Sequence, residues 1–416
     1  MNRLLLDALC TCPPRLSILC AGSPNRCAFA SHRVLRRQLS AATAAAAFAY
    51  RDTLRQRRHN APNTAVSNVD RSISRPLTDF RQSISTLLTS ERAGSGHDVI
   101  VLALDGIPLT LARAHWPRAR IEGMDSVFPS TSATAWLSSL SGMTVEEHGI
   151  PGVVFRTRET GLINIYRHHN ALDVPDRGNI FADAVAAGYR AIAISADLEA
   201  APCAWLDVLL RGAERIGRDR FYAGDTAQRP EHIVESIRAA VRRERDKSQQ
   251  PNLIWCFVEV DRHIHRHGYD ADVLRLLDLV DALAVEWART GAMVIAHSDH
   301  GLVPTQHDPE IAAAIEASAH EFGCHLGGAG RTRWFYPEPG DRERMLARLQ
   351  QRFAGIARVC ASEEMFLAGS EILYRVGSVL LIAETGQFAT FDGHRFDHGS
   401  CLSDEIEVPF AHWNGD

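Results

Sequence analysis

The chain has 416 residues, of which 45% are hydrophobic and 23% charged, so it suffices for one large α/β domain with an appendage or for two ordinary domains. Its formal net charge of −5 gives no general attraction to nucleic acid or to an anionic membrane, and we expect no nucleic-acid partner. No run approaches the roughly 20 apolar residues that span a bilayer, so we expect no membrane span.

The first segment, residues 1–93, is predicted to be a poorly ordered extension. It is rich in arginine, poor in acidic residues and interrupted by an alanine tract at Ala41–Ala47. Such a composition would also suit an organelle transit peptide or an overlong gene start. A secretory signal is a further alternative because Leu4–Leu6 follow Arg3, although Asp7 interrupts the apolar run. A targeting role therefore stays open.

The cysteines argue against a disulfide framework. There are nine, an odd number, and they are widely spaced with no C-x-x-C pair. Cys256 lies in an apolar run and is predicted to be a small buried residue. This pattern favours a reducing compartment such as the cytoplasm.

From His97 onward, apolar runs of strand length alternate with segments of helical periodicity. The predicted buried strands are Val99–Leu104, Ala191–Ser195, Leu253–Val260 and Ala292–Ala296. The predicted helices are Ile180–Ala187, Pro230–Arg245 and Asp272–Thr290. This alternation predicts an α/β fold over residues 94–416, with a mostly parallel central sheet and helices on both faces.

The pattern is looser over residues of about 303–395. It predicts a helix at Arg342–Phe353 and strands at Arg333–Tyr336 and Ser378–Ala383. We expect a small α+β insertion that folds over the functional site. The chain would then return to the main sheet with a final strand at Val408–His412.

Polar side chains follow the predicted strands where each strand ends. Asp105 follows Leu104, Asp261 follows Val260, and Asp299 comes shortly after Ala296. Because the carboxyl ends of parallel strands meet at one edge of a sheet, we expect these side chains to lie together. Carboxylates and imidazoles from several segments are the ligands that divalent metals need. The full candidate set is Asp105, Ser132, Asp261, His265, Asp299, His300 and His398.

Each of these residues also has an ordinary structural interpretation. Asp299-His300-Gly301 alone is typical of a capped turn. His265 is flanked by His263 and His267, so that a histidine-rich surface turn would have a similar sequence. Only the position of the candidates at successive strand ends favours the metal site.

Three hydroxyl residues, Ser130-Thr131-Ser132, precede a predicted helix at Ala133–Leu140. A helix N-cap is the ordinary role for serine and threonine at such a position. The oriented backbone N–H groups of a helix start also favour a phosphoryl oxygen or a nucleophile with a lowered pKa. The two interpretations are compatible.

In combination, these motifs resemble the alkaline phosphatase superfamily, and most closely its type I phosphodiesterase and nucleotide pyrophosphatase branch. The resemblance covers about residues 97–413, and the motifs occur in the same order as in the family. The extension before residue 93 has no counterpart in the family. The segments that carry it are HDVIVLALDG (97–106), SVFPSTSATAWLSSLSGMTVEEHGIPG (126–152), VEVDRHIHRHG (258–268), SDHG (298–301) and DHGS (397–400).

The resemblance implies a site with two divalent metals, for which zinc is favoured and manganese or iron are alternatives. One metal would be bound by Asp261, His265 and His398. The other would be bound by Asp105, Asp299, His300 and the hydroxyl of the nucleophile. The motif spacing nominates Ser132 as that nucleophile, with Thr131 as the alternative, and implies hydrolysis through a covalent phosphoseryl intermediate. His148 matches a family segment and is expected to be structural.

Two departures from the family pattern bear on the substrate. The asparagine that nucleotide pyrophosphatases carry three positions after the nucleophile is replaced by Ala135. The arginine with which alkaline phosphatases bind a dianionic monoester is absent between Ser132 and Glu146. A singly charged phosphoryl group needs less cationic support, so these departures favour a small-molecule diester or a phosphonate over a monoester.

The alternative functions are a phosphomonoesterase or phosphotransferase of the same superfamily, and a non-catalytic metal-binding relative. The leaving group and the oligomeric state stay open. We expect ordinary surface positions for His168-His169, Arg156 and Trp334, and a place in the lining of the substrate pocket is the alternative.

Overall fold

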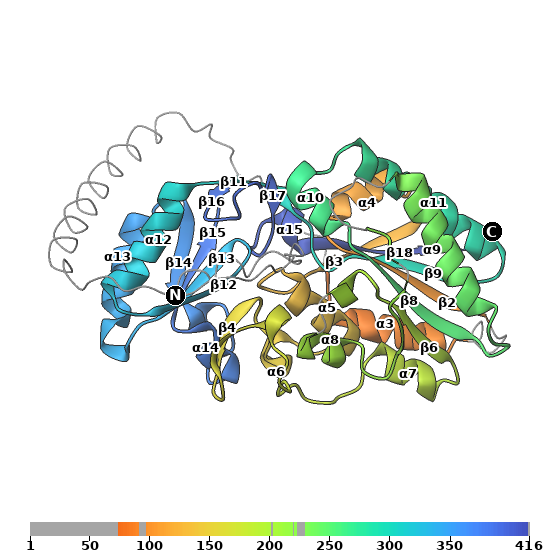
Figure 1. Ribbon diagram of the computed structural model, residues 1–416, viewed down its shortest axis with the longest axis horizontal. Coiled ribbons are helices and arrows are strands. Elements are labelled where there is room, and N and C mark those ends of the chain that lie inside the picture. Colours follow the sequence, from red (N-terminus) through yellow and green to blue (C-terminus); the bar gives the residue numbers. More distant parts are fainter. Residues whose placement is uncertain (1–73, 91–96, 201–202, 219, 223–228, 415–416) are drawn as a thin grey trace, which may run out of the picture.

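The computed structural model describes residues 74–90, 97–200, 203–218, 220–222 and 229–414. Within these ranges the largest element is an eight-stranded sheet with the strand order β1-β3-β18-β9-β2-β8-β6-β7 (Figure 1). In that order the strands are β1 (Arg75–Pro76), β3 (Arg120–Asp125), β18 (Glu407–Trp413), β9 (Met293–His297), β2 (Val99–Leu104), β8 (Asn252–Val258), β6 (Arg190–Ile194) and β7 (Glu214–Ile216).

This sheet is mixed. The neighbouring strands β9, β2, β8 and β6 are mutually parallel, as are the edge pairs β1–β3 and β6–β7. The returning strand β18 instead runs antiparallel to both β3 and β9. The fold is therefore α/β, and its parallel strands place their carboxyl ends along one edge.

Helices cover both faces of the sheet, because successive side chains of a strand point to opposite sides. On β2, Val99, Val101 and Ala103 enter one apolar cluster, whereas Ile100, Leu102 and Leu104 enter the other. The first cluster packs against α3 (Asp79–Leu88), α5 (Ser132–Ser141), α7 (Ile180–Ala186) and α8 (Ala204–Leu209), and the second against α4 (Leu109–His115), α9 (Pro230–Arg245), α10 (Asp261–His267) and α11 (Ala271–Arg289) (Figure 1).

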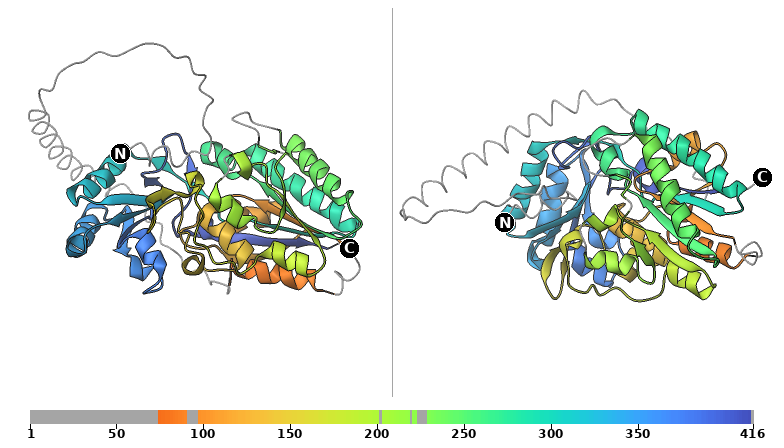
Figure 2. Two further views of the ribbon diagram at one scale, coloured as in Figure 1. Left: turned by 60° about the horizontal axis from the view of Figure 1, so that its bottom comes forward. Right: turned by 45° about the vertical axis from the view of Figure 1, so that its right-hand side comes forward.

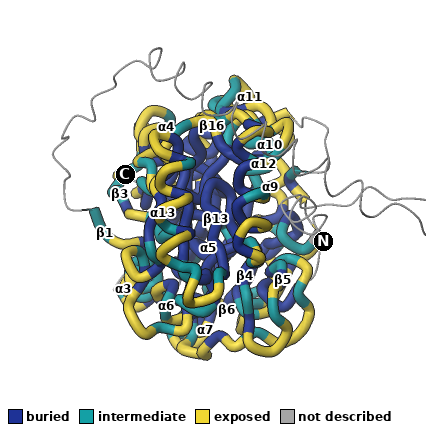
Figure 3. Tube along the Cα trace, turned by 90° about the vertical axis from the view of Figure 1, so that its left-hand side faces the viewer, coloured by how far each residue is buried: buried dark blue, intermediate teal, exposed yellow. Residues whose placement is uncertain are grey.

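A six-stranded second sheet lies beside the first (Figure 2). Its strands, in spatial order, are β14 (Ala357–Ala361), β15 (Val379–Ala383), β13 (Thr332–Tyr336), β12 (His325–Ala329), β4 (Val154–Thr157) and β5 (Gly161–Asn164). One face packs against α12 (Pro309–Glu321) and α13 (Arg342–Arg352), whose outer sides are exposed while β13 is buried (Figure 3). The helix α14 (Glu371–Val376) contacts β4.

The second sheet differs from the predicted insertion in its membership. The strands β4 and β5 precede residue 303 by more than 100 positions, yet β4 pairs with β12. Residues 303–395 therefore do not form this layer alone. A hairpin from the first half of the chain completes the sheet, because Val154 of β4 pairs with Gly328 at the edge strand β12.

Short elements connect the two sheets near the functional site. Two of them are small ladders in which β10 (Val303–Pro304) pairs with β17 (Phe396–Asp397), and β11 (Gln306–His307) pairs with β16 (Gln387–Phe388). Two further short helices are α6 (Val145–His148), which follows α5, and α15 (Ser403–Ile406), which precedes β18. These ladders bring the segment before His398 back to the carboxyl edge of the main sheet.

Residues 74–90 differ from the expectation of a poorly ordered extension up to residue 93. The strand β1 pairs with β3, and Phe80, Ile84 and Leu88 of α3 are buried in the first apolar cluster. The amphipathic spacing of these residues matches one helix face, and it was obscured in the sequence by the biased composition around it. The rest of the predicted extension, residues 1–73, lies outside the described residues.

Replacement of Phe80 by alanine is expected to lower the free energy of unfolding by about 3–5 kcal/mol, because it leaves a cavity in a fully buried position. The Phe80 ring also stacks on His297, with 3.7 Å between ring centroids. Urea denaturation of the full chain measures the change. A loss below about 1 kcal/mol would show that α3 is dispensable for the domain. Val185, exposed at 58% on α7, is a control position for substitution by alanine.

Every helix in the described part of the chain is too short or too polar to cross a membrane. The five described cysteines are free thiols, and Cys256 is buried in β8 as predicted.

Candidate metal centre

The fold brings together the seven residues that the sequence nominated. Asp105 follows β2, Asp261 opens α10 just after β8, and Asp299 and His300 follow β9. Since β9, β2 and β8 are neighbours, these residues share one stretch of the carboxyl edge. Ser132 arrives from the first turn of α5. His398 arrives from the segment after β17 and completes the set.

One group of donors surrounds the Ser132 hydroxyl. Its Oγ lies 3.1 Å from His300 Nε2 and 3.4 Å from Asp105 Oδ1. His300 Nε2 is also 3.2 Å from Asp299 Oδ2. Donor atoms of Asp105, Asp299 and His300 lie within 4.8 Å of one another, and all three residues are buried. A single divalent ion fits such a set of two carboxylates and one imidazole.

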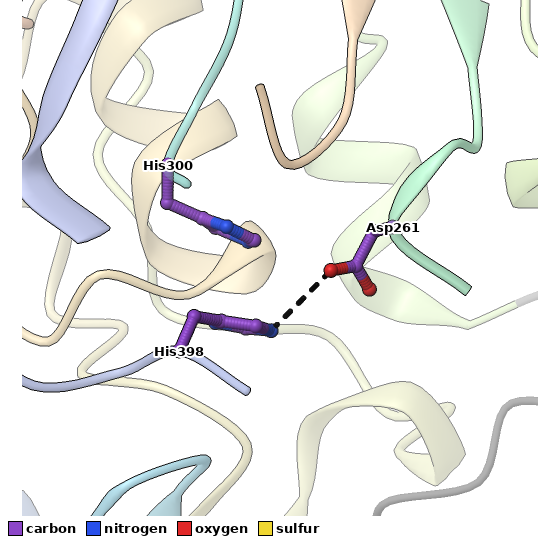
Figure 4. Close-up of side chains that lie close together, drawn as sticks. All are labelled: Asp261, His300 and His398. Carbon is purple, nitrogen blue, oxygen red and sulfur yellow. Dashed lines mark ion pairs between the residues drawn. The ribbon is translucent and has the colours of Figure 1, made fainter. Parts of the chain in front are cut away.

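A second group adjoins the first. His265 Nε2 lies 3.1 Å from Asp261 Oδ2, and His398 Nε2 lies 3.8 Å from Asp261 Oδ1. The rings of His398 and His300 stack with 3.7 Å between centroids, so the two groups share a boundary (Figure 4). Donor atoms of Asp261, His300 and His398 themselves lie within 4.8 Å of one another. The site is thus one continuous cluster whose donor atoms form more than one group of metal-ligand type.

The backbone orients each imidazole. The Nδ1 atoms of His265 and His398 lie 2.8 Å from the carbonyl oxygens of Phe396 and Ser130, respectively. A carbonyl only accepts hydrogen bonds, so each Nδ1 carries the proton and each Nε2 faces the carboxylates. An Nε2 lone pair opposite a carboxylate oxygen needs a proton or a metal ion between them. This arrangement is typical of metal-binding histidines.

Two buried carboxylate oxygens in the cluster, Asp261 Oδ1 and Asp299 Oδ2, accept no hydrogen bond from the protein. Buried carboxylates without donors are costly unless a cation neutralises them. The donor types and these oxygens together fit a divalent metal ion.

The pKa shifts of the three carboxyl groups also indicate that the site lacks positive charge. Burial, and then the charge of Asp261, raises the pKa of Asp299 to about 8. Burial, and then the charge of Asp299, raises the pKa of Asp105 well above its ordinary value. Burial also opposes ionisation of Asp261, but the imidazoles of His265, His398 and His300 outweigh it and lower the pKa of that carboxyl. Three ionised carboxylates therefore need added cations in this pocket.

The three hydroxyls at the start of α5 have different surroundings. The Oγ of Ser130 donates to the Ser400 carbonyl at 3.0 Å. The Oγ1 of Thr131, the N-cap residue, lies 3.3 Å from the Thr134 hydroxyl. Of these three hydroxyls, that of Ser132 contacts the cluster of carboxylates and imidazoles, through Asp105 and His300. The helix N-terminus stabilises negative charge on that oxygen.

Sequence reasoning did not assign three residues that border the site. Asp397 is buried, its Oδ1 accepts from the His398 N–H at 2.8 Å, and it groups with His265 and His398 as a possible ligand. The His394 ring stacks on His265 at 4.1 Å. Burial, and then the charge of Asp105, raises the pKa of Tyr166 well above its ordinary value. The DHGS motif contained Asp397, but no sequence signal marked His394 or Tyr166.

The remaining histidines and pocket candidates lie in other environments. His148 is fully buried, with Nε2 2.9 Å from the Ser138 hydroxyl, which fits a structural role. His263 pairs with Asp270 at 2.9 Å. Trp334, expected on the surface, is fully buried in the second sheet because β12 and β15 flank its strand. Arg156 lies over the rings of Tyr336 and Tyr374, and His169 is exposed.

Solved structures with a similar fold include two groups of hydrolases. Murine ectonucleotide pyrophosphatase/phosphodiesterase 5, as an inactive variant in complex with AMP, has a TM-score of 0.55 and 15% identity, covering 77% of this chain and 88% of that chain. Phosphonoacetate hydrolase from Sinorhizobium meliloti 1021 in complex with phosphonoformate has a TM-score of 0.56 and 18% identity, covering 76% and 90%. At these identities the likeness shows the fold.

Comparison with curated protein sequences gave no match. The family model described as type I phosphodiesterase / nucleotide pyrophosphatase matches residues 118–400, which is more than half of the chain and includes Ser132, Asp261, His265, Asp299, His300 and His398. The resemblance seen in the sequence motifs is thereby confirmed. The chain belongs to the type I phosphodiesterase / nucleotide pyrophosphatase family and is a phosphoric ester hydrolase.

Proposed function

We propose that this chain is a metal-dependent phosphodiesterase that cleaves phosphodiester or pyrophosphate-type bonds with Ser132 as its nucleophile. The observation that carries the proposal is the Ser132 hydroxyl beside Asp105 and His300, next to a second cluster of metal-ligand type. A serine at the start of a helix needs no such surroundings for a structural role. A metal-activated nucleophile does.

The donor set supports two divalent ions, of which zinc fits best and manganese or iron are alternatives. One would be held by Asp261, His265 and His398. The other would be held by Asp105, Asp299, His300 and the Ser132 hydroxyl. Bound divalent ions in such sites lower the pKa of a coordinated hydroxyl and neutralise charge on phosphoryl and leaving oxygens.

The chain's own residues then account for the covalent step. Ser132 Oγ attacks phosphorus in line, and its bond to phosphorus forms while the bond to the leaving oxygen breaks. The Ser132 hydroxyl gives up its proton to solvent, the leaving oxygen takes up a proton, and the phosphoryl group remains bonded to Ser132 as a phosphoseryl ester. Water then cleaves this ester and restores the hydroxyl, so that two inversions retain the configuration at phosphorus. The α5 N-terminus stabilises the negative charge that the Oγ carries before it bonds to phosphorus and again as the ester is cleaved.

Three arginines near the site are engaged by other groups of the protein, which favours a singly charged phosphoryl group as the substrate. Arg331 pairs with Glu405 at 2.8 Å, and Arg262 pairs with Glu259 at 2.9 Å. Arg333 is buried and donates to the backbone carbonyls of Gly330, Thr332 and Ala389. These guanidinium groups are engaged by the protein, and a dianionic monoester would lack their support. Ala135, in place of the asparagine of related enzymes, offers no polar group.

The experiment that tests this function combines metal analysis with two model substrates. Chelator-washed, zinc-reloaded enzyme is assayed on bis-p-nitrophenyl phosphate and p-nitrophenyl phosphate. We expect two metal ions per chain and a kcat/KM at least about tenfold higher for the diester, because the second charge of the monoester lacks an arginine partner. Activity on the monoester alone would favour the phosphomonoesterase alternative. Failure to bind any metal would refute the proposal.

A further inference from the structure

The segment His398–Ser400 is held tightly from the side of the second sheet. The Arg331 N–H donates to the His398 carbonyl at 2.7 Å, and the Thr332 hydroxyl donates to the Gly399 carbonyl at 2.6 Å. Gly330 has a φ of +51°, and a Cβ at that position would lie 2.0 Å from the His398 carbonyl oxygen. The β12–β13 turn therefore fixes one side of the backbone that carries His398.

Ser130 holds the same segment from the opposite side. Its carbonyl lies 2.8 Å from His398 Nδ1. Its hydroxyl accepts from the Gly399 N–H at 3.2 Å and donates to the Ser400 carbonyl at 3.0 Å. Ser130 is fully buried, so no solvent replaces these bonds. A hydroxyl is required here because the position needs both a donor and an acceptor.

We infer that Ser130 is a positioning residue that couples the nucleophile loop to the metal ligand His398. Ser130 lies two positions before Ser132, and one short segment thus presents the nucleophile and anchors a ligand of the neighbouring metal. Its carbonyl fixes the tautomer and tilt of the His398 ring, and its hydroxyl fixes the backbone that follows. This inference rests on the proposed metal role of His398.

The test is calorimetric titration of the metal-free full chain with Zn²⁺. In Ser130→Ala, and in Ser130→Cys, whose thiol is a weak donor and acceptor of similar size, we expect one of two sites to bind about tenfold more weakly. The site that contains Asp105, Asp299 and His300 should keep its affinity. Ser130→Thr retains the hydroxyl and should bind both ions with affinity close to that of the wild type.

Ser139→Ala is the matched control. Ser139 is equally buried on α5 and donates to the Trp136 carbonyl at 3.1 Å. We expect this variant to lose a comparable hydrogen bond with both Zn²⁺ affinities unchanged, and the thermal unfolding of each metal-free variant records its general destabilisation. Unchanged affinity at both sites in Ser130→Ala and Ser130→Cys would overturn the inference and leave the proposed function standing. Equal weakening in Ser139→Ala would also overturn it. A wild-type chain that binds no zinc would overturn the proposed function as well.

Discussion

Replacement of Ser132 by alanine is expected to lower kcat for diester hydrolysis by at least about 10⁴-fold while the protein still binds its metals. The Oγ of Ser132 faces Asp105 and His300, and alanine leaves no atom there that can form a bond to phosphorus. Asp105, Asp299 and His300 supply three donors without the serine, so metal binding should survive. Steady-state kinetics and metal analysis of the same preparation measure both properties.

The neighbouring threonine provides the matched control. Thr131→Val removes a buried hydroxyl that lies beside Thr134 and makes no N-cap hydrogen bond. We expect its kcat to stay within about tenfold of the wild type, since a single buried hydrogen bond is worth about 1 kcal/mol. Acid quenching during diester turnover should leave the substituted phosphoryl group on the wild-type chain and none on Ser132→Ala. An inactive Thr131 variant beside an active Ser132 variant would show that the nucleophile had been assigned wrongly.

Strong local signals allowed several elements to be predicted to within a residue. The uninterrupted apolar run Val99–Leu104 is the strand β2, and Pro230–Arg245, with proline in the first turn, is the helix α9. Leu253–Val260 was predicted too long. The strand ends at Val258, and Val260 is already the N-cap of α10. Val260 is apolar beyond the end of the strand because it is itself fully buried in the second apolar cluster.

The site was predictable to the extent that strand ends mark it. Asp105, Asp261 and Asp299 follow three neighbouring strands, so their proximity needed only the topology of the sheet. Their partners depend on tertiary packing. The hairpin β4–β5 joins β12 through a single backbone contact region, and no local pattern in either segment encodes that pairing. His394 also reaches the site through tertiary packing, since its ring stacks on His265, which lies far earlier in the chain.

Removal of the metals is expected to abolish activity and to make stability depend steeply on pH between 7 and 9. Without metal, burial raises the pKa of Asp299 to about 8, and Asp261 outweighs the effect of burial and raises the pKa of His265 to about 9. Both values lie above those of the unfolded chain, so the folded metal-free protein binds more protons in this range. Its stability is therefore greatest at the lower pH and falls as the pH rises through these values. Chelation should eliminate turnover, and zinc should restore it.

Bound zinc should suppress this pH dependence, because the ions supply the positive charge that the protons provided. From pH 7 to 9 we expect the metal-free chain to lose on the order of 2 kcal/mol of unfolding free energy relative to the zinc-loaded chain. Urea denaturation at pH 7, 8 and 9 measures the difference. Asp299→Asn removes one titrating group and should flatten the curve of the metal-free protein. If the unfolding free energy changed equally with pH in the metal-free and zinc-loaded chains, Asp299 and His265 would not be the groups that cause the pH dependence. Zinc that displaces their protons must change the number of protons released on unfolding.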